Sequence, residues 1–192
     1  MKNYLIFSQL EFLFPKNKKS KIFAISDDVF LNSKNYEKNF SKVIVPRHRW
    51  LSQKKTHKDW KYLYKLNRIF IKNIHKQLNL IHKTNYSENF WYMFISPWSL
   101  PFIQIIFDRW HAINSIINRN KKKFFFTKEI NFENNEKLVP LDTEEFLEIF
   151  RNDYWNQFIV QGISKNFNRI FYIKSKNRYK IEKHLNKKKS QI

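Results

Sequence analysis

The chain has 192 residues and a formal net charge of +21, from 37 Lys and Arg against 16 Asp and Glu. Its aromatic content of 18% is too high for a disordered protein, and its length is enough for one domain with a sizeable core. The single glycine, Gly162, excludes glycine-rich phosphate-binding loops, and the absence of cysteine excludes disulfides, thiolate metal sites and cysteine nucleophiles.

The strands predicted from the sequence are separated by connecting segments, which is typical of an α/β fold. Apolar runs at residues 4–10, 21–26 and 42–45 predict the first three strands. Residues 124–130 predict a fourth strand, and residues 169–174 a short fifth one. We therefore expect an α/β fold with an incomplete Rossmann-like parallel sheet and long helices.

Three helices are predicted between the third and fourth strands. Apolar residues recur at three- and four-residue steps from residue 56 to 82, which predicts a helix of roughly 40 Å. A second helix is predicted over residues 85–95. Pro97 and Pro101 are expected to break it, because proline removes a helical hydrogen bond, and a third helix follows over residues 102–118.

The C-terminal part is predicted to hold one further helix and a basic tail. Asp142 and Glu145 form a capping box that begins a helix running to about Ser164. From residue 174 onward, eight Lys or Arg stand against one Glu, with only a weak helical pattern. We therefore divide the chain into an α/β domain, residues 1–173, and a basic, disordered tail, residues 174–192.

An uncharged run at residues 90–107 is followed by two adjacent charges, Asp108 and Arg109. Eighteen residues are near the minimum for a membrane span, but prolines and polar residues interrupt them, so a buried helix pair is favoured over membrane placement. The two charges project about 100° apart on a helix, so each needs its own partner. Structural partners are favoured, a carboxylate for Arg109 and a backbone cap for Asp108; the alternative is direct ligand contact.

Basic and aromatic residues directly follow the third predicted strand, as Arg47-His48-Arg49-Trp50. Ligands bind at the carboxyl ends of strands in open α/β sheets. Two Arg and a His at such an end can hold a phosphate or carboxylate, with Trp50 as a stacking wall. An ordinary basic loop is an equally good interpretation.

Acidic residues, Asp27 and Asp28, follow the second predicted strand. They can bind a hydroxyl-rich ligand or a metal, although a helix cap is the commoner role. The six histidines have no metal-ligand spacing, and no Ser-His-Asp arrangement can be argued from spacing alone. We expect no metal site.

The positive charge has two interpretations that the sequence leaves open. One is a polyanionic partner: nucleic acid, an anionic membrane surface or a phosphorylated substrate. The other is that abundant Lys, Asn, Ile and Phe reflect codons rich in A and T. The N-terminus lacks the apolar region and cleavage site of a signal peptide, so we expect a cytoplasmic protein, with the inner face of the membrane as an alternative location.

Several short motifs follow one another between Tyr4 and Ser164. They are Leu10-Glu11 and Phe14-Pro15; Trp50 with Asp59-Trp60-Lys61-Tyr62-Leu63; Asn79-Leu80-Ile81-His82; Trp91; Ser96-Pro97-Trp98; Phe107-Asp108-Arg109-Trp110; and Pro140, Asp142, Glu145-Phe146, Asp153 and Trp155-Asn156. In this order they resemble a transferase family found in bacterial O-antigen and surface-polysaccharide gene clusters.

The resemblance implies a glycosyltransferase-like enzyme with two α/β domains, of the GT-B-like type, of which this chain is the N-terminal, acceptor-side domain. It implies sugar transfer from an activated sugar donor to a polysaccharide or lipid-linked acceptor, in O-antigen, lipopolysaccharide or other surface-polysaccharide biosynthesis. Full members of the family continue into a second domain, whereas this chain ends in a basic tail that does not resemble them. We therefore expect a truncated or split gene product, or a partial sequence, inactive without a second-domain polypeptide. No cofactor is expected, and peripheral contact with an anionic membrane is a further expectation.

Under this resemblance, the substrate-binding candidates are Arg47, His48, Arg49, Trp50, Trp98, Asp108 and Arg109. The general base has to be a carboxylate or a His near the acceptor hydroxyl, and the sequence does not choose between His48, Glu11 and Asp27. Two alternatives stand beside this hypothesis. One is a basic nucleic-acid-binding protein, which the tail and the aromatic content permit, and the other is a degenerate fragment without activity.

Overall fold

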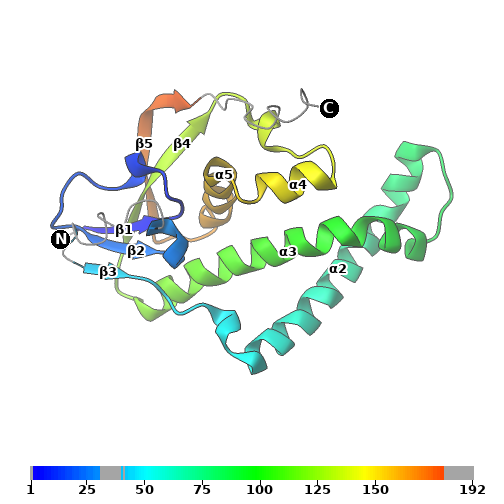
Figure 1. The fold of residues 1–192 in the computed structure, drawn as a ribbon, viewed down its shortest axis with the longest axis horizontal. Helices are drawn as coiled ribbons and strands as arrows, with labels where there is room; N and C mark the ends of the chain where they lie inside the picture. Colours follow the sequence, from blue (N-terminus) through cyan, green and yellow to red (C-terminus); the bar gives the residue numbers. More distant parts are fainter. Residues whose placement is uncertain (1, 31–39, 41, 180–192) are drawn as a thin grey trace, which may run out of the picture. The chain divides into compact units, whose positions relative to one another are not determined.

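The computed structural model describes residues 2–30, 40 and 42–179, which form two compact units. Unit 1 consists of Met1–Pro46 and Arg109–Ile192, and unit 2 of Arg47–Asp108. The elements in chain order are β1 (Asn3–Ile6), η1 (Glu11–Leu13), β2 (Lys21–Ala24), η2 (Asp27–Phe30), β3 (Lys42–Ile44), η3 (Arg49–Leu51), α2 (Gln53–His82), α3 (Glu88–Arg119), β4 (Phe125–Phe132), η4 (Asn135–Leu138), α4 (Thr143–Ile149), α5 (Asp153–Ser164) and β5 (Ile170–Tyr179) (Figure 1).

Unit 1 is built on a five-stranded sheet in the order β3-β2-β1-β4-β5, with every pairing parallel. The chain moves outward from β1 through β2 to β3, then crosses back to place β4 on the other side of β1. This reversal of direction is the topological switch of a doubly wound sheet. The predicted α/β class is confirmed, and the sheet is consistent with an incomplete Rossmann-like fold.

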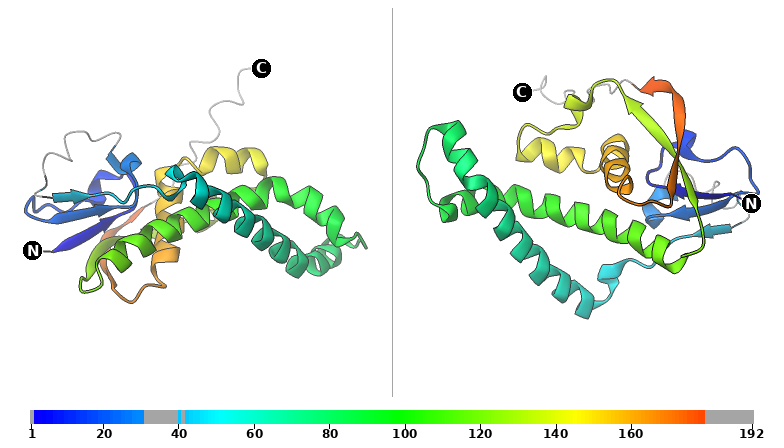
Figure 2. Two further views of the ribbon diagram at one scale, coloured as in Figure 1. Left: turned by 90° about the horizontal axis from the view of Figure 1, so that it is seen from below. Right: turned by 180° about the vertical axis from the view of Figure 1, so that it is seen from behind.

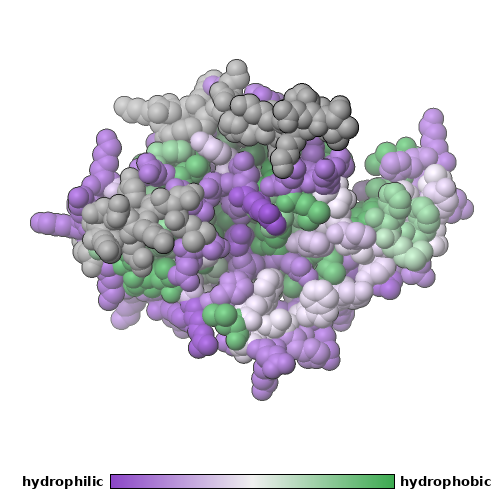
Figure 3. Space-filling view, viewed as in Figure 1, coloured by the Kyte–Doolittle hydropathy of each residue, from purple (hydrophilic) through white to green (hydrophobic). Residues whose placement is uncertain are grey.

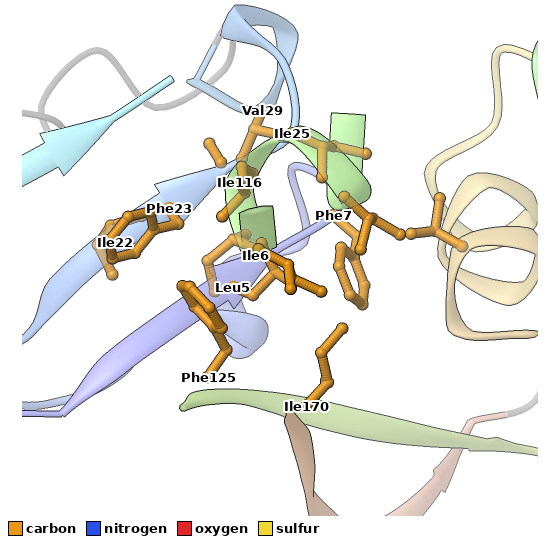
Figure 4. Packing of buried hydrophobic residues seen from close by; sticks show 14 of the residues in the cluster. Leu5, Ile6, Phe7, Ile22, Phe23, Ile25, Val29, Ile116, Phe125 and Ile170 are labelled. Carbon is orange, nitrogen blue, oxygen red and sulfur yellow. The ribbon is translucent and has the colours of Figure 1, made fainter. Parts of the chain in front are cut away.

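The core of unit 1 explains why these short apolar runs become strands. Parallel strands covered on both faces are apolar at successive residues, and β1 and β2 are buried in this way around Leu5 and Phe23. Figure 4 shows Phe23 and Phe125 close to each other, and their ring centroids lie 5.0 Å apart in an edge-to-face arrangement. Ile116, from the last turns of α3, belongs to the same cluster, which attaches that helix to the sheet.

Two strand ends differ from the prediction by more than two residues. The first strand ends at Ile6, whereas the prediction extended it to residue 10. The last strand continues to Tyr179, so residues 174–179, predicted to be tail, pair with β4. Strand pairing uses the backbone, so a sequence rich in Lys and Arg can form an outer strand despite its low apolar content. The rest of the predicted tail, residues 180–192, lies outside the described residues.

The predicted helix from Asp142 to Ser164 is two helices. Asp142 caps α4 by accepting a hydrogen bond from the Glu145 N–H at 2.8 Å, which confirms the predicted cap. Asn152 then begins α5, because its Oδ1 accepts from the N–H groups of Tyr154 and Trp155. A second cap inside the expected helix therefore starts a new one.

A buried glutamine fixes α5 to the sheet. The pairing of β4 with β5 shifts register between Glu129 and Asn131, at Ile130. Gln161 of α5 accepts from the Ile130 N–H at 3.0 Å and donates to the Ile130 carbonyl at 3.1 Å. The side chain thus satisfies the backbone groups at this irregularity, as buried polar groups require.

Unit 2 is a helical hairpin, formed by α2 and the part of α3 up to Asp108 (Figure 2). Its helices are joined through Asn67, which is fully buried in α2. Asn67 donates to Ser96 at 3.0 Å and accepts from Ser99 at 2.6 Å. The predicted break at Pro97 and Pro101 is wrong, because α3 runs unbroken through both prolines. The two serines tied to α2 flank Pro97, and these bonds support the helix where proline removes one of its own.

Among the described residues, α3 is the one helix long and apolar enough to cross a membrane, judged by length and composition. Only 11% of its apolar segment is buried, in contrast to the buried helix pair predicted from the sequence.

Candidate functional site

A pocket of about 310 Å³ lies in unit 1, at the carboxyl ends of β1 and β2. This is the edge where ligands bind in open α/β sheets, and the volume lies at the small end of the range for ligand pockets. The lining combines apolar, polar and charged side chains: Phe7, Ser8, Gln9, Ile25, Ser26, Asp28, Val29, Arg109, Phe150, Arg151, Asp153 and Asn156. We call it the carboxyl-edge pocket.

Asp153 is the acid of this pocket whose environment differs most from water. It occupies the first turn of α5, and its Oδ1 accepts from the Gln9 N–H at 3.2 Å. Burial raises the pKa of the Asp153 carboxyl above its ordinary value, while the bond from Gln9 acts in the opposite direction. A carboxylate with a raised pKa in a pocket is a candidate for proton transfer.

Arg109 enters the same pocket from α3 and is oriented by an amide. Its Nη2 donates to Asn156 Oδ1 at 3.1 Å. The Asn156 amide is itself fixed, because its Nδ2 donates to the carbonyls of Phe150 at 2.8 Å and Asn152 at 3.0 Å. The sequence prediction that Arg109 has a partner of its own is confirmed, and the Asn156 amide is one such partner. A fixed guanidinium can bind an anionic or hydroxyl group of a ligand.

Two buried polar atoms beside the pocket have no hydrogen-bond partner among the described residues. They are Gln9 Oε1 and Gln157 Nε2. Gln9 lines the pocket, and Gln157 accepts from the hydroxyl of Ser8, another lining residue, at 3.2 Å. Unsatisfied buried polar groups are uncommon in native proteins and often mark a functional site.

His48 and Asp108 form a pair within unit 2, with His48 Nε2 and Asp108 Oδ1 2.9 Å apart. His48 Nδ1 accepts from the Trp50 N–H at 3.2 Å, which places the ring proton on Nε2 as the donor to Asp108. Asp108 thus binds the His48 side chain, and the backbone cap expected for it stays a prediction. Both nitrogens of His48 are engaged, so it can act as a base only after one of these bonds breaks.

Arg49 and Trp50 both bind the buried carboxylate of Asp59, at the start of α2. Arg49 donates through Nε and Nη2, the latter at 2.7 Å, and Trp50 Nε1 donates at 3.1 Å. The hydrogen bonds that Arg49 donates to Asp59 raise the pKa of Arg49. This arrangement fixes η3 onto α2, so these two candidates have a structural role in the hairpin.

The remaining predicted residues lie outside the carboxyl-edge pocket. Glu11 is exposed beside a separate pocket near Lys128, and Asp27 is exposed at the start of η2. Arg47 is exposed in unit 2, and Trp98 stacks on Phe102 with ring centroids 5.4 Å apart. Of the predicted site residues, the pocket contains Arg109 alone.

The sequence analysis offered Asp28, beside Asp27, as a possible ligand-binding acid, but it did not identify Arg151, Asp153 or Asn156 as pocket residues. These three surround the start of α5, which the prediction had placed inside a longer helix. Recognising Asn152 as a helix cap would have placed Asp153 at a helix start. Among the described residues, no group of three or more His, Asp or Glu could hold a metal ion.

Comparison with protein families identifies a match over nearly the whole chain. A family model described as LIC12162 family transferase matches residues 4–192. The match runs beyond Ser164 to the last residue, so it includes the basic tail that was expected to lie outside the resemblance. No curated protein and no solved structure matches the chain.

Proposed function

The chain belongs to the LIC12162 transferase family, and on that premise we propose that it is the acceptor-binding part of a glycosyltransferase acting in O-antigen or other surface-polysaccharide biosynthesis. The observation that carries the proposal is the carboxyl-edge pocket, with an acid of raised pKa and a fixed arginine in one small site.

The lining suits a carbohydrate. Sugars present hydroxyl groups that donate and accept hydrogen bonds, together with apolar ring faces. Asp28, Asp153 and Asn156 supply oxygen acceptors, while Phe7 and Phe150 supply apolar surface. A mostly apolar wall with a few placed polar groups is the usual composition of a small-molecule site.

Asp153 is the general base in this proposal. The acceptor hydroxyl oxygen forms a bond to the anomeric carbon of the activated sugar, and the bond from that carbon to the leaving phosphate breaks. The hydroxyl proton moves to the carboxylate of Asp153, which the Gln9 N–H holds through Oδ1. A raised pKa favours this step, because a base works best when its pKa is near the working pH.

Arg109 positions the acceptor in this proposal. Asn156 holds its guanidinium, so the ligand meets a donor of fixed direction, and less side-chain freedom is lost on binding. Arg151 lies in the same lining and adds a second positive charge, although its side chain is exposed.

The carboxyl-edge pocket serves as the acceptor site in this proposal, and the family resemblance implies that a second domain binds the activated donor. This part of the proposal comes from the resemblance and has a direct test. The purified 192-residue chain is incubated with a panel of nucleotide-sugars and sugar acceptors, and release of nucleotide is measured. We expect none, and turnover by the chain alone contradicts an acceptor-only role.

Acceptor binding is tested separately, by saturation-transfer NMR and calorimetry with the monosaccharides and disaccharides of surface polysaccharides. We expect at least one sugar to bind. Because Arg151 is exposed, Arg151→Gln should fold normally and weaken binding several-fold, and Arg109→Gln should weaken it by tenfold or more, the loss expected for a charged hydrogen bond.

Glu144→Gln is the matched control, because Glu144 is exposed on α4 and does not line the pocket. It should bind sugar as the parent chain does. The acceptor site is refuted if no sugar binds, or if both arginine variants bind as tightly as this control.

A further inference from the structure

The hairpin of unit 2 carries a cluster of exposed apolar side chains at its closed end. Leu80 is 80% exposed and Ile81 71%, and in the next helix Met93 and Phe94 are each 72% exposed. Tyr86, in the connecting loop, is also exposed. Figure 3 shows hydrophobic side chains gathered at this end of the hairpin. We call these five residues the apolar tip. Exposed clusters of large apolar residues commonly mark an interaction site.

A stripe of positive charge runs along α2 towards the apolar tip. Its members recur at three- and four-residue steps and all are exposed: Lys54, Lys58, Lys61, Lys65, Arg68, Lys72 and Lys76. At about 100° per residue they fall within roughly 80° of arc, and at 1.5 Å per residue they extend over about 33 Å. We call this the basic stripe.

The charge of unit 2 is strongly one-sided. Its sequence holds eleven Lys and Arg against three acidic residues, a net charge of +8. Two of the three acidic residues are paired, Asp59 with Arg49 and Asp108 with His48. The third, Glu88 at the start of α3, is the acidic residue nearest the apolar tip in sequence. The surface therefore suits an anionic partner.

The contacts within the hairpin argue against α3 crossing a membrane. The Asn67 side chain binds Ser96 and Ser99, which ties the apolar segment of α3 to α2. The loop end is tied as well, because Asn79 Oδ1 accepts from Trp91 Nε1 at 2.9 Å. A helix with seven exposed cations in one stripe cannot enter hydrocarbon at acceptable cost, and α3 is bonded to it.

We propose that the α2–α3 hairpin docks end-on to an anionic lipid bilayer. The apolar tip enters the interface, and the nearest exposed lysines, Lys72 and Lys76 of the basic stripe and Lys83 at the end of α2, bind lipid phosphates. Exposed aliphatic residues beside basic ones are the signature of interfacial membrane binding. Nucleic acid would leave Leu80 and Ile81 in water, and a second copy of the hairpin would bring together two surfaces of the same charge.

The test is co-sedimentation of the full chain with vesicles of phosphatidylcholine, alone or containing phosphatidylglycerol. We expect binding to the anionic vesicles only. Met93→Ser with Phe94→Ser should weaken it by tenfold or more, since two exposed apolar side chains no longer leave water. Val139→Ser with Leu141→Ser is the matched control, with residues 59% and 83% exposed in unit 1, and should leave binding unchanged.

Two pairs of lysines in the basic stripe distinguish end-on docking from general attraction. Lys72→Gln with Lys76→Gln should weaken binding by about 25-fold, from about fivefold for each cation near the lipid surface. Lys54→Gln with Lys58→Gln removes the same charge from the same helix. Those two lie about 33 Å or more from Leu80 along the axis, far beyond the Debye length of about 8 Å, so the loss should be under threefold.

Three results would overturn the proposal. The first is absence of binding to anionic vesicles. The second is an equal loss of vesicle binding from the two lysine pairs, or no loss from the tip variant. Either result would mean that the whole basic stripe attracts polyanions in general, as it would attract RNA, without end-on docking. The third is a tip variant that changes the oligomeric state in sedimentation velocity and leaves vesicle binding intact, which would assign the apolar tip to a second copy of the chain.

Discussion

Gln161 offers the most direct test of how α5, and with it Asp153, is held against the sheet. Its amide forms two hydrogen bonds to the backbone of Ile130, at 3.0 and 3.1 Å, where the pairing of β4 with β5 is irregular. Gln161→Leu keeps a side chain of similar size and removes both bonds. A buried N–H and a buried carbonyl then have no partner, at about 1–3 kcal/mol each.

We therefore expect Gln161→Leu to lower the free energy of unfolding by about 2–4 kcal/mol, because some relaxation at the sheet edge offsets the full loss. Urea denaturation followed by circular dichroism measures this, and the melting temperature should fall by roughly 6–12 °C. Gln77→Leu, at an exposed position on α2, is the control. A loss of under about 0.5 kcal/mol, equal to that of the control, would refute the proposed role of Gln161.

Three further predictions concern other polar side chains. Folding raises the pKa of Asp153, so its stabilising contribution is present below its unfolded pKa of about 3.9 and is lost as pH rises through the folded pKa. From about pH 4 upward, the free energy of unfolding should therefore fall relative to that of Asp153→Asn. Urea titrations at several pH values measure this. Asp59→Asn should cost about 2–3 kcal/mol in the same assay, because it leaves Arg49 without its buried carboxylate, and a cost near zero would contradict this. Asn79→Ala removes hydrogen bonds to the loop of the hairpin and to Trp91, so the Trp91 indole should become more mobile. Time-resolved fluorescence anisotropy measures this in a chain whose other tryptophans are replaced by Phe. An unchanged anisotropy decay would count against the predicted role of Asn79.

The strands were predictable because strands buried on both faces must be apolar at successive residues. The runs around Leu5 and Phe23 show this pattern plainly. The end of β5 was not predictable in this way, because residues 174–179 pair through their backbone and carry many charges. The local composition therefore predicted a solvated tail, whereas pairing with the neighbouring strand β4 makes this segment part of the sheet.

The helices failed to match the prediction where long-range contacts compete with local signals. Pro97 and Pro101 are strong local breakers, yet α3 continues through them, with Ser96 and Ser99 bonded to Asn67 of α2. No pattern within residues 85–118 contains that partner. At Asn152 the signal was present, since Asn is a favoured helix cap, but the apolar pattern continued through it and hid the boundary.

The candidate site was predictable in position and less so in its residues. The expected edge, the carboxyl ends of the strands, does hold a pocket, and Arg109 does lie in it. Its acid, Asp153, lies at the start of a helix that follows another helix. A search for polar residues directly after strands therefore could not identify it. The residues after β3 were chosen for their position, but Arg49 and Trp50 bind Asp59.

The central claim is that the carboxyl-edge pocket of unit 1 binds the sugar acceptor. Backbone NMR of the labelled full chain, titrated with the best-binding sugar, tests it most directly. The amide of Gln9 is the principal reporter, because it donates to Asp153 at the pocket wall. We predict shifts at Gln9, Asp28 and Asn156 that saturate together, and their loss in Arg109→Gln. Shifts confined to α2, with the Gln9 amide unchanged at saturation, would contradict the account.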